Sequence, residues 1–232
     1  MSSENELDLS IVMPCLNEDK TLGACITEAQ RFISAHGLNA EILISDNGST
    51  DNSARIAEDL GAVVINEPRR GYGRAIRTGI EHSSGKVIIF GDCDTTYDFF
   101  HLEGFYFPLE RGEYDVMIGD RFKGGIEKGA MPFLHRLGVP FLSWCGRRKF
   151  RTDVRDFHCG LRSLTRKAAG KAQFRTEGME FATEMIGECA RQGLRIGQTP
   201  TKLRKCDCDR VSKLHTFTDG MRHLKYIIMS AF

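Results

Sequence analysis

Apolar and polar positions alternate with two different periods along the first part of the chain. Short apolar runs typical of buried strands are each followed by a segment in which apolar residues recur with the period of a helix. The predicted strands are Leu9–Met13, Ala40–Ser45, Ala62–Ile65 and Lys86–Phe90, and the predicted helices are Thr21–His36, Asp51–Leu60 and Gly73–His82. Strands that alternate with helices pair in parallel through crossover helices. The pattern therefore predicts an α/β fold with a mostly parallel, doubly wound sheet.

Polar loops follow three of these strands. The segments are Pro14–Glu18, Asp46–Asp51 and Gly91–Asp94, and all are rich in acids and amides. Any one of them is also ordinary turn and N-cap chemistry. In doubly wound sheets, however, ligands bind outside the carboxyl ends of the strands, where the three loops should meet. Together they predict a polar binding site at that edge.

Asp92 and Asp94 are separated by one residue directly after the apolar strand, so both carboxylates can face one hard cation. A Mg²⁺ or Mn²⁺ ion held in this way completes its shell with water and with phosphate oxygens. The chain contains neither a Gly-x-G-x-x-Gly loop after the first strand nor a GxxxxGK[ST] motif. A dinucleotide site and a P-loop NTPase are therefore disfavoured.

The 232 residues, 41% of them hydrophobic, suit one globular domain, but the net charge of +1 conceals an uneven distribution. Residues 1–120 hold 9 basic and 21 acidic side chains, residues 121–175 hold 14 and 3, and the remainder holds 9 and 7. A basic block indicates an anionic partner, such as a phosphate, a membrane surface or nucleic acid. A solvated basic face is the alternative.

Within this block, residues 131–144 are apolar and aromatic, and the basic run Arg147–Arg151 follows them. This composition is typical of an interfacial helix in the headgroup plane of a membrane, and an ordinary core helix is the alternative. No window reaches the roughly 18 consecutive apolar residues of a spanning helix. The sequence ends inside the apolar stretch Tyr226–Phe232, which leaves room for a membrane anchor or a partner subunit.

The acidic N-terminus lacks the apolar segment of a signal peptide, so we expect a cytoplasmic protein with free thiols. Cys206 and Cys208 are separated by one residue, a spacing that matches neither a CxxC redox site nor a paired zinc knuckle.

Six motifs in fixed order, IVMPCLNE, SDNGSTD, GYGRAIRTGI, FGDCD, GDRF and DFHCGLRS, resemble glycosyltransferase family 2 enzymes of the dolichyl-phosphate mannose and glucose synthase type. The resemblance covers residues 9–228. It implies one GT-A-like domain, with a nucleotide-sugar-binding half at 9–120 and an acceptor and membrane-proximal half at 121–232. It further implies a divalent metal, Mg²⁺ or Mn²⁺, and transfer of a hexose with inversion from a GDP- or UDP-sugar to a polyprenyl phosphate.

The resemblance also assigns roles to individual residues. It places Pro14, Asn17, Glu18 and Asp46 around the base and ribose, and Asp92 and Asp94 on the metal and the donor diphosphate. Arg121 would receive the acceptor phosphate, and Asp156, His158, Gly160 and Arg162 would form the loop over sugar and acceptor. Glu184, in a predicted helix over Met179–Gln192, would face the site, and Arg204, Arg210, Ser212 and Lys213 would fold back on the donor diphosphate. Ala182 stands where many relatives have a further acid.

A phosphate acceptor needs positioning and charge compensation more than deprotonation, because it is already largely dianionic at neutral pH. Arginines suit that task. A family 2 enzyme acting on a sugar hydroxyl is the alternative, and it would need Asp156 or Glu184 as a base. A non-catalytic nucleotide-sugar-binding subunit of a membrane complex is the alternative from another class. We expect a peripheral protein at the cytoplasmic face of an anionic membrane, with no nucleic acid partner, and the donor sugar stays open.

Overall fold

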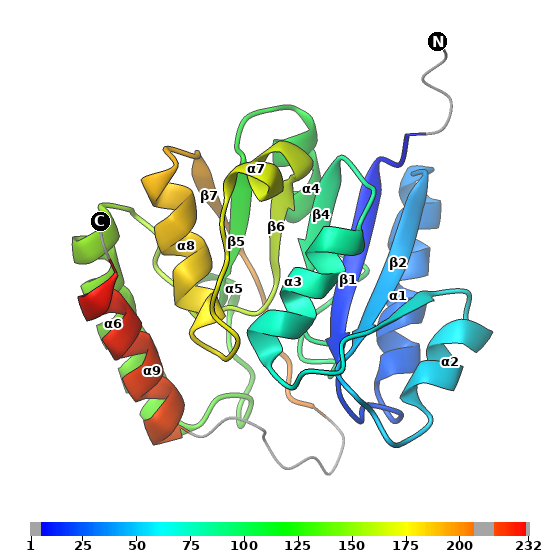
Figure 1. Cartoon of the computed structure of the whole chain (residues 1–232), viewed down its shortest axis with the longest axis horizontal. Coiled ribbons are helices and arrows are strands. Elements are labelled where there is room, and N and C mark those ends of the chain that lie inside the picture. The colour runs from blue at the N-terminus through cyan, green and yellow to red at the C-terminus, as the bar shows by residue number, and fades with distance from the viewer. Residues whose placement is uncertain (1–5, 207–215, 231–232) are drawn as a thin grey trace.

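Seven strands form one mixed sheet within the described residues, 6–206 and 216–230, of the computed structural model (Figure 1). Their order across the sheet is β3-β2-β1-β4-β6-β5-β7. The strands are β1 (Leu9–Cys15), β2 (Ala40–Asp46), β3 (Val63–Asn66), β4 (Val87–Phe90), β5 (Val116–Asp120), β6 (Arg162–Thr165) and β7 (Ile196–Pro200). Only β6 runs antiparallel to its neighbours in this sheet, β4 and β5. The mostly parallel α/β sheet predicted from the sequence is confirmed.

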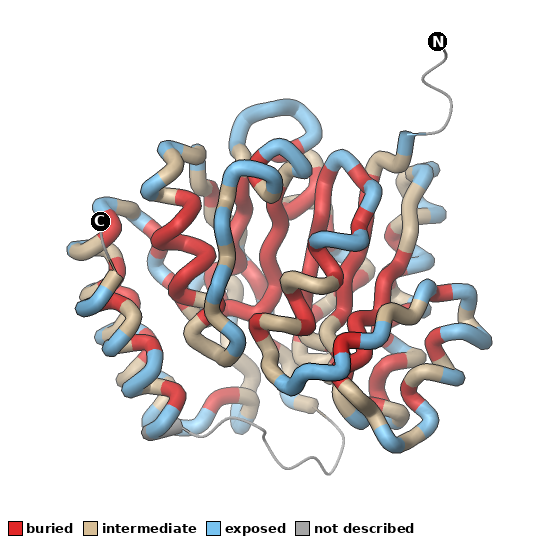
Figure 2. The backbone as a smooth tube through the Cα atoms, in the orientation of Figure 1, coloured by how far each residue is buried: buried red, intermediate tan, exposed pale blue. Residues whose placement is uncertain are grey.

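Helices cover both faces of the sheet. They are α1 (Leu22–His36), α2 (Ser53–Asp59), α3 (Tyr72–His82), α4 (Glu103–Glu110), α5 (Arg121–Gly124), α6 (Phe133–Phe150), α7 (Arg166–Lys171), α8 (Phe181–Arg191) and α9 (Thr216–Met229). In β1, Ile11 packs into the layer with α1 and α4, whereas Val12 packs into the layer with α3 and α8. Both residues are fully buried, as expected for a central strand covered on both sides. Figure 2 shows this burial concentrated in the central strands.

The predicted boundaries agree with the structure within one or two residues, and the difference at α2 has a clear physical cause. This helix begins at Ser53, whereas the sequence pattern predicts a start at Asp51. Asp51 instead caps the turn before the helix: its Oδ1 accepts the Ser53 N–H at 2.9 Å, and its Oδ2 accepts the Asp19 N–H at 3.1 Å. The side chain thereby joins the loop after β2 to the loop after β1.

One face of α6 belongs to the core. Gly146 lies so close to Phe157 that a Cβ atom would sit 2.5 Å from its ring. Phe150 stacks on Phe157 with ring centroids 6.2 Å apart and also contacts Tyr226 of α9. Exposed residues alternate with these buried ones along both helices (Figure 2). The helix α6 therefore has a core face and a solvent face, and the interfacial position at a membrane stays a prediction.

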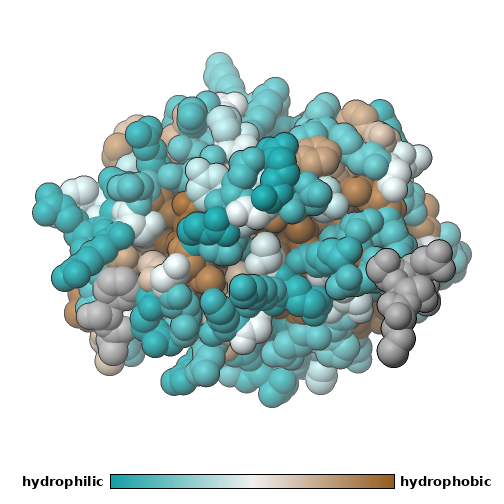
Figure 3. Space-filling view, turned by 90° about the horizontal axis from the view of Figure 1, so that it is seen from above, coloured by the Kyte–Doolittle hydropathy of each residue, from teal (hydrophilic) through white to brown (hydrophobic). Residues whose placement is uncertain are grey.

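Within the described ranges, none of the helices has the length and the apolar composition that crossing a membrane requires. Seen from the end that carries the amino ends of the central strands, the surface is largely hydrophilic, with apolar side chains showing between the polar ones (Figure 3).

Among the described cysteines, all but one are free thiols, as the sequence predicts. Cys15, Cys25, Cys93, Cys145, Cys159 and Cys189 are free thiols. Cys206 is disulfide-bonded, which corrects the prediction of free thiols throughout. The spacing of the cysteines along the chain gives no signal for this bond.

Candidate active site

The carboxyl ends of β1, β2, β4, β5 and β7 and the amino end of β6 meet at one edge of the sheet, at the bottom of Figure 1. Cys15 at the end of β1 pairs in register with Asp46 at the end of β2, so the loops that follow start side by side. The loops after β4 and β5 and the chain before β6 join them. The structure places these sequence-predicted residues along this edge: Pro14, Asn17, Glu18, Asp46, Asp92, Asp94, Arg121, Asp156 and His158.

Asn17 locks the loop after β1 to the loop after β2. Its backbone N–H donates to Ser49 Oγ at 2.9 Å, and its Oδ1 accepts the Thr50 N–H at 2.7 Å. Its φ of 53° is left-handed, a conformation that asparagine tolerates better than most residues. Asp46 accepts the Ser49 N–H through both oxygens, at 3.1 and 3.2 Å. The side chains of Asn17 and Asp46 thus fix the loops after β1 and β2 at this edge of the sheet.

Asn47 is a site residue that the sequence analysis did not single out. Its side chain is buried and donates to the carbonyls of Glu67 at 2.9 Å and Arg69 at 2.8 Å, while its Oδ1 accepts the Gly71 N–H at 2.8 Å. It joins the loop after β2 to the chain between β3 and α3. The only signal was its place in an Asn-Gly pair, which is equally typical of a plain turn.

The acid pair lies at the end of β4, next to the loop before β6. Asp92 packs so closely on Gly160 that a Cβ atom there would lie 2.3 Å from Asp92 Oδ2. Gly160 N–H donates to the buried Tyr97 hydroxyl at 2.8 Å. Tyr72 hydrogen-bonds Asp92, and desolvation together with this carboxylate raises the pKa of Tyr72 well above its ordinary value. Gly160 is therefore required by close approach, which explains its place in the DFHCGLRS motif.

Asp94 sits beside a strained residue. Thr95 has a left-handed φ of 63°, which is uncommon for a β-branched side chain, and Asp94 Oδ1 accepts the Thr96 N–H at 3.1 Å. The turn thus holds the second carboxylate in a defined orientation after the strand ends.

These two carboxylates fit a hard divalent ion. Carboxylate oxygens are the ligands that Mg²⁺ and Mn²⁺ prefer. Within 6–206 and 216–230, no group of three or more His, Cys, Asp or Glu side chains is arranged to hold a metal. Ions that use only one or two protein carboxylates complete their shell with water and with phosphate oxygens of a substrate. The donor set therefore suits a metal that binds together with a diphosphate.

Arg121 and Asp156 form a buried, two-pronged ion pair. Arg121 Nε donates to Asp156 Oδ2 at 2.6 Å, and Nη2 donates to Oδ1 at 2.8 Å. The Asp156 side chain is fully buried and that of Arg121 is 10% exposed. Burial alone would lower the pKa of Arg121, but the attraction of Asp156 outweighs it and the pKa is raised well above its ordinary value. The guanidinium is thus permanently charged and fixed at the end of β5.

His158 lies beside this pair, and both of its ring nitrogens are covered and have no hydrogen-bond partner among the described residues. Its ring contacts that of His223 of α9 edge to face, with centroids 4.3 Å apart. His223 Nδ1 is held by the Thr183 hydroxyl at 2.8 Å. Burial, followed by the charges of His223 and Arg121, lowers the pKa of His158 well below its ordinary value. His223 is a second residue that the sequence analysis missed, because nothing in its local sequence connects it to the loop before β6.

Arg162, which the resemblance places in the loop over sugar and acceptor, lies in the interior at the start of β6. The side chain is 1% exposed. Its guanidinium donates to the main-chain carbonyls of Cys159 at 2.7 Å, Phe157 at 2.6 Å and Ala182 at 2.6 Å. These bonds satisfy the buried charge and hold the loop before β6 against α8.

Glu184, which the resemblance predicts to face the site, is also buried and hydrogen-bonded within the protein. It is 3% exposed and accepts the N–H groups of Arg175 and Thr176, both at 2.9 Å, and the Thr176 hydroxyl at 2.6 Å. Its carboxylate caps the loop that packs on the start of α3, where Glu177 O accepts the Gly73 N–H at 2.9 Å.

Arg204, predicted to fold back on the donor diphosphate, forms ion pairs within the protein. It donates to Glu28 of α1 at 2.9 Å and pairs with Asp98 in the loop after β4. Its backbone N–H donates to the Thr96 carbonyl at 2.9 Å. The predicted donor-binding residues Arg210, Ser212 and Lys213 lie outside the described residues.

The seven-stranded α/β domain has a GT-A-like fold. The structure superposes on that of glucosyl-3-phosphoglycerate synthase from Mycobacterium tuberculosis, solved with Mn²⁺, uridine diphosphate and glucosyl-3-phosphoglycerate, with a TM-score of 0.74 at 22% identity. The match covers 96% of this chain and 79% of that one. Residues 10–183 match the family described as glycosyl transferase family 2. The chain belongs to this family.

Relatives from Haloferax volcanii resemble the chain over nearly its whole length. It is 34% identical over 224 residues to the low-salt glycan biosynthesis hexosyltransferase Agl6, covering 96% of this chain and 54% of Agl6. It is 29% identical over 221 residues to a dolichyl-phosphate hexose transferase, covering 95% and 92% of the two chains. The chain thus spans about half the length of Agl6 and nearly all of the second relative.

Proposed function

We propose that the protein transfers a hexose, with inversion, from a nucleotide sugar to a polyprenyl phosphate, and that the reaction depends on Mg²⁺ or Mn²⁺. The single observation that carries the choice of acceptor is the engagement of two carboxylates. Asp156 is fully buried in its ion pair with Arg121, and Glu184 is 3% exposed and accepts three hydrogen bonds. A sugar-hydroxyl acceptor would require one of these two acids as its general base.

Asp92 and Asp94 would hold the metal, which when bound supplies positive charge to the departing nucleoside diphosphate. The loops after β1 and β2, locked by Asn17 and Asp46, form the wall against which the nucleoside binds. The Mn²⁺ and uridine diphosphate of the mycobacterial synthase support this assignment at the level of the shared fold. Because the loops are already hydrogen-bonded to one another, little ordering is left for donor binding.

The acceptor phosphate binds beside Arg121. A phosphate monoester is largely dianionic at neutral pH and attacks without a general base, so its requirement is a fixed positive charge. Arg121 meets it, because Asp156 holds two edges of the guanidinium and leaves Nη1 for the ligand. His158, whose backbone N–H donates to Asp156 at 3.1 Å, lies beside this pair and is the second side chain that we assign to the acceptor loop. The dolichyl-phosphate hexose transferase of Haloferax volcanii supports a polyprenyl phosphate as the acceptor.

The test is direct. The purified chain is incubated with Mg²⁺ or Mn²⁺, a short polyprenyl phosphate and, one at a time, GDP-mannose, UDP-glucose and UDP-N-acetylglucosamine, and the lipid is analysed by mass spectrometry. We expect the lipid to gain one sugar with one of these donors. The matched control is the same polyprenol without its phosphate, which should gain nothing. Transfer to a sugar hydroxyl but not to the polyprenyl phosphate would overturn the proposal.

A further inference from the structure

The outer face of α6 carries an unusual row of large apolar side chains. Phe133, Leu137, Phe141 and Trp144 recur at helical spacing and, with Leu134, are between 49% and 73% exposed. The rings of Phe141 and Trp144 stack with centroids 6.4 Å apart. Apolar residues gathered in this way on a helix that already buries its other face mark a contact surface.

The flanks of this row are basic. The Arg148 guanidinium lies over the Trp144 ring, 5.5 Å from its centre, and the adjoining α9 carries exposed Arg222 and Lys225. No acidic residue occurs in α6 itself. The exposed charges around this row are all positive, so the same surfaces of two copies would repel each other. A second copy of the chain is therefore a poor partner for this face.

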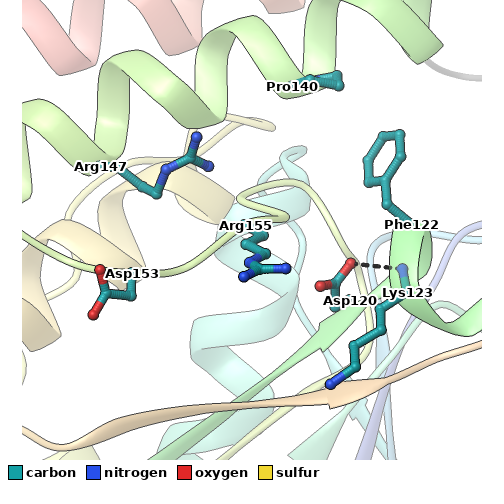
Figure 4. A pocket seen from close by; sticks show the side chains of 7 residues that line it. All are labelled: Asp120, Phe122, Lys123, Pro140, Arg147, Asp153 and Arg155. Carbon is teal, nitrogen blue, oxygen red and sulfur yellow. Dashed lines mark hydrogen bonds between the residues drawn. The ribbon is translucent and has the colours of Figure 1, made fainter.

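A cavity of about 880 Å³ opens beneath α6, between this helix, α5 and the chain before β6 (Figure 4). In Figure 4 the Arg147 and Arg155 side chains point into it, and Phe122 and Pro140 stand at its other end. Pro140 lies on the exposed side of α6, between Leu137 and Phe141 in sequence. The cavity therefore opens beside the apolar row.

The charges inside this cavity favour an anion. Lys123, Arg147 and Arg155 contribute three cations, and none of them forms a salt bridge with any described residue. Asp120 and Asp153 contribute two carboxylates, but Asp120 is 3% exposed and caps α5 by accepting the Lys123 N–H at 3.0 Å. Three unpaired cations beside an apolar rim match the phosphate of a lipid headgroup and the start of its acyl chains.

We infer that α6 docks on an anionic lipid bilayer, with Phe133, Leu137, Phe141 and Trp144 in the boundary between headgroups and acyl chains. The cavity of Lys123, Arg147 and Arg155 then holds a phospholipid headgroup phosphate, at a place separate from Arg121. The inference rests on the proposed function only in that a polyprenyl acceptor lies in a membrane. Its test measures binding and not transfer, so the two can fail independently.

The experiment is co-sedimentation of the full chain with vesicles of phosphatidylcholine alone and of phosphatidylcholine mixed with phosphatidylglycerol. We expect binding to the mixed vesicles and much weaker binding to the neutral ones. The double variant Arg147→Gln/Arg155→Gln should weaken binding to the mixed vesicles about 30-fold, since each cation near an anionic surface contributes about fivefold. The double variant Phe141→Ser/Trp144→Ser should weaken it by about tenfold or more, because two aromatic side chains lose their apolar contact.

Matched controls come from the far side of the molecule. Val63 on the edge strand β3 is 53% exposed, and Arg55 on α2 is exposed in a surface pair with Asp59. Val63→Ser and Arg55→Gln should bind as the unaltered protein does, and circular dichroism verifies that every variant is folded. Equal binding to neutral and anionic vesicles, or unchanged binding by both double variants, would overturn the inference. Concentration-dependent dimerisation without vesicle binding would assign the face to a second copy instead.

Discussion

Removing the Asp156 carboxylate should destabilise the protein strongly, because it would leave the Arg121 guanidinium buried without a counter-charge. The two groups are joined by bonds of 2.6 and 2.8 Å, and their side chains are 0% and 10% exposed. Breaking a buried pair in this way costs about 3–5 kcal/mol, out of a total unfolding free energy of about 5–15 kcal/mol. Asp156→Ala should therefore lose about a fifth or more of the unfolding free energy of the protein.

A second variant separates charge burial from packing. Asp156 also accepts the backbone N–H groups of Arg121 and His158, at 3.2 and 3.1 Å, so alanine leaves these without an acceptor as well. Asp156→Asn combined with Arg121→Met removes both charges and keeps a side-chain oxygen for one of the two N–H groups, which bond different carboxylate oxygens. It should regain about 2 kcal/mol or more relative to Asp156→Ala, because no unpaired charge stays buried. Neither variant should transfer sugar, since the acceptor phosphate has lost its fixed cation.

The measurement is urea unfolding followed by far-ultraviolet circular dichroism, with transfer to the polyprenyl phosphate assayed on the same preparations. If the unfolding free energy of Asp156→Ala is lower by less than about 1 kcal/mol, Arg121 and Asp156 do not form a buried ion pair. If the double variant still transfers sugar to the phosphate, Arg121 does not hold the acceptor and that part of the proposed function is wrong.

Three further predictions concern the metal site, the glycine that packs against one of its carboxylates, and the dependence of stability on pH. Asp94→Ala should abolish transfer with an unchanged circular dichroism spectrum, and activity retained at saturating Mn²⁺ would remove Asp94 from the metal site. Gly160→Ala should raise the Mn²⁺ concentration needed for half-maximal activity about 10–100-fold, because its Cβ displaces the Asp92 carboxylate; a metal titration decides this. Burial lowers the pKa of His223 from 6.5 to about 4. Between pH 6.5 and 4 the imidazole is protonated in the unfolded chain but stays largely neutral in the folded protein. The free energy of unfolding should therefore fall by about 3 kcal/mol as pH drops from 6.5 to 4. Acid unfolding of His223→Gln should lack this loss.

The order of strands and helices could be predicted from the sequence because it depends on local periodicity. Apolar runs such as Val87–Phe90 are buried on both faces and are recognisable without knowledge of their neighbours. The same pattern placed Asp92 and Asp94 at a sheet edge, since parallel strands bring their carboxyl ends together. The antiparallel β6 was not predicted, because its pairing with β4 and β5 joins segments more than forty residues apart.

The sequence by itself determined the α/β architecture, the acidic loops at one edge and the membership of glycosyltransferase family 2, all of which rest on residue types in a fixed order. Only the tertiary structure decided which charged side chains form their hydrogen bonds within the protein. Arg162 and Glu184 are matched to family motifs, yet main-chain groups satisfy both of them in the interior: carbonyls of α8 and the loop before β6 for Arg162, and N–H groups of the loop before α8 for Glu184. A buried charge is stable only where the fold supplies its partners, and a linear sequence does not show which partners the fold will bring.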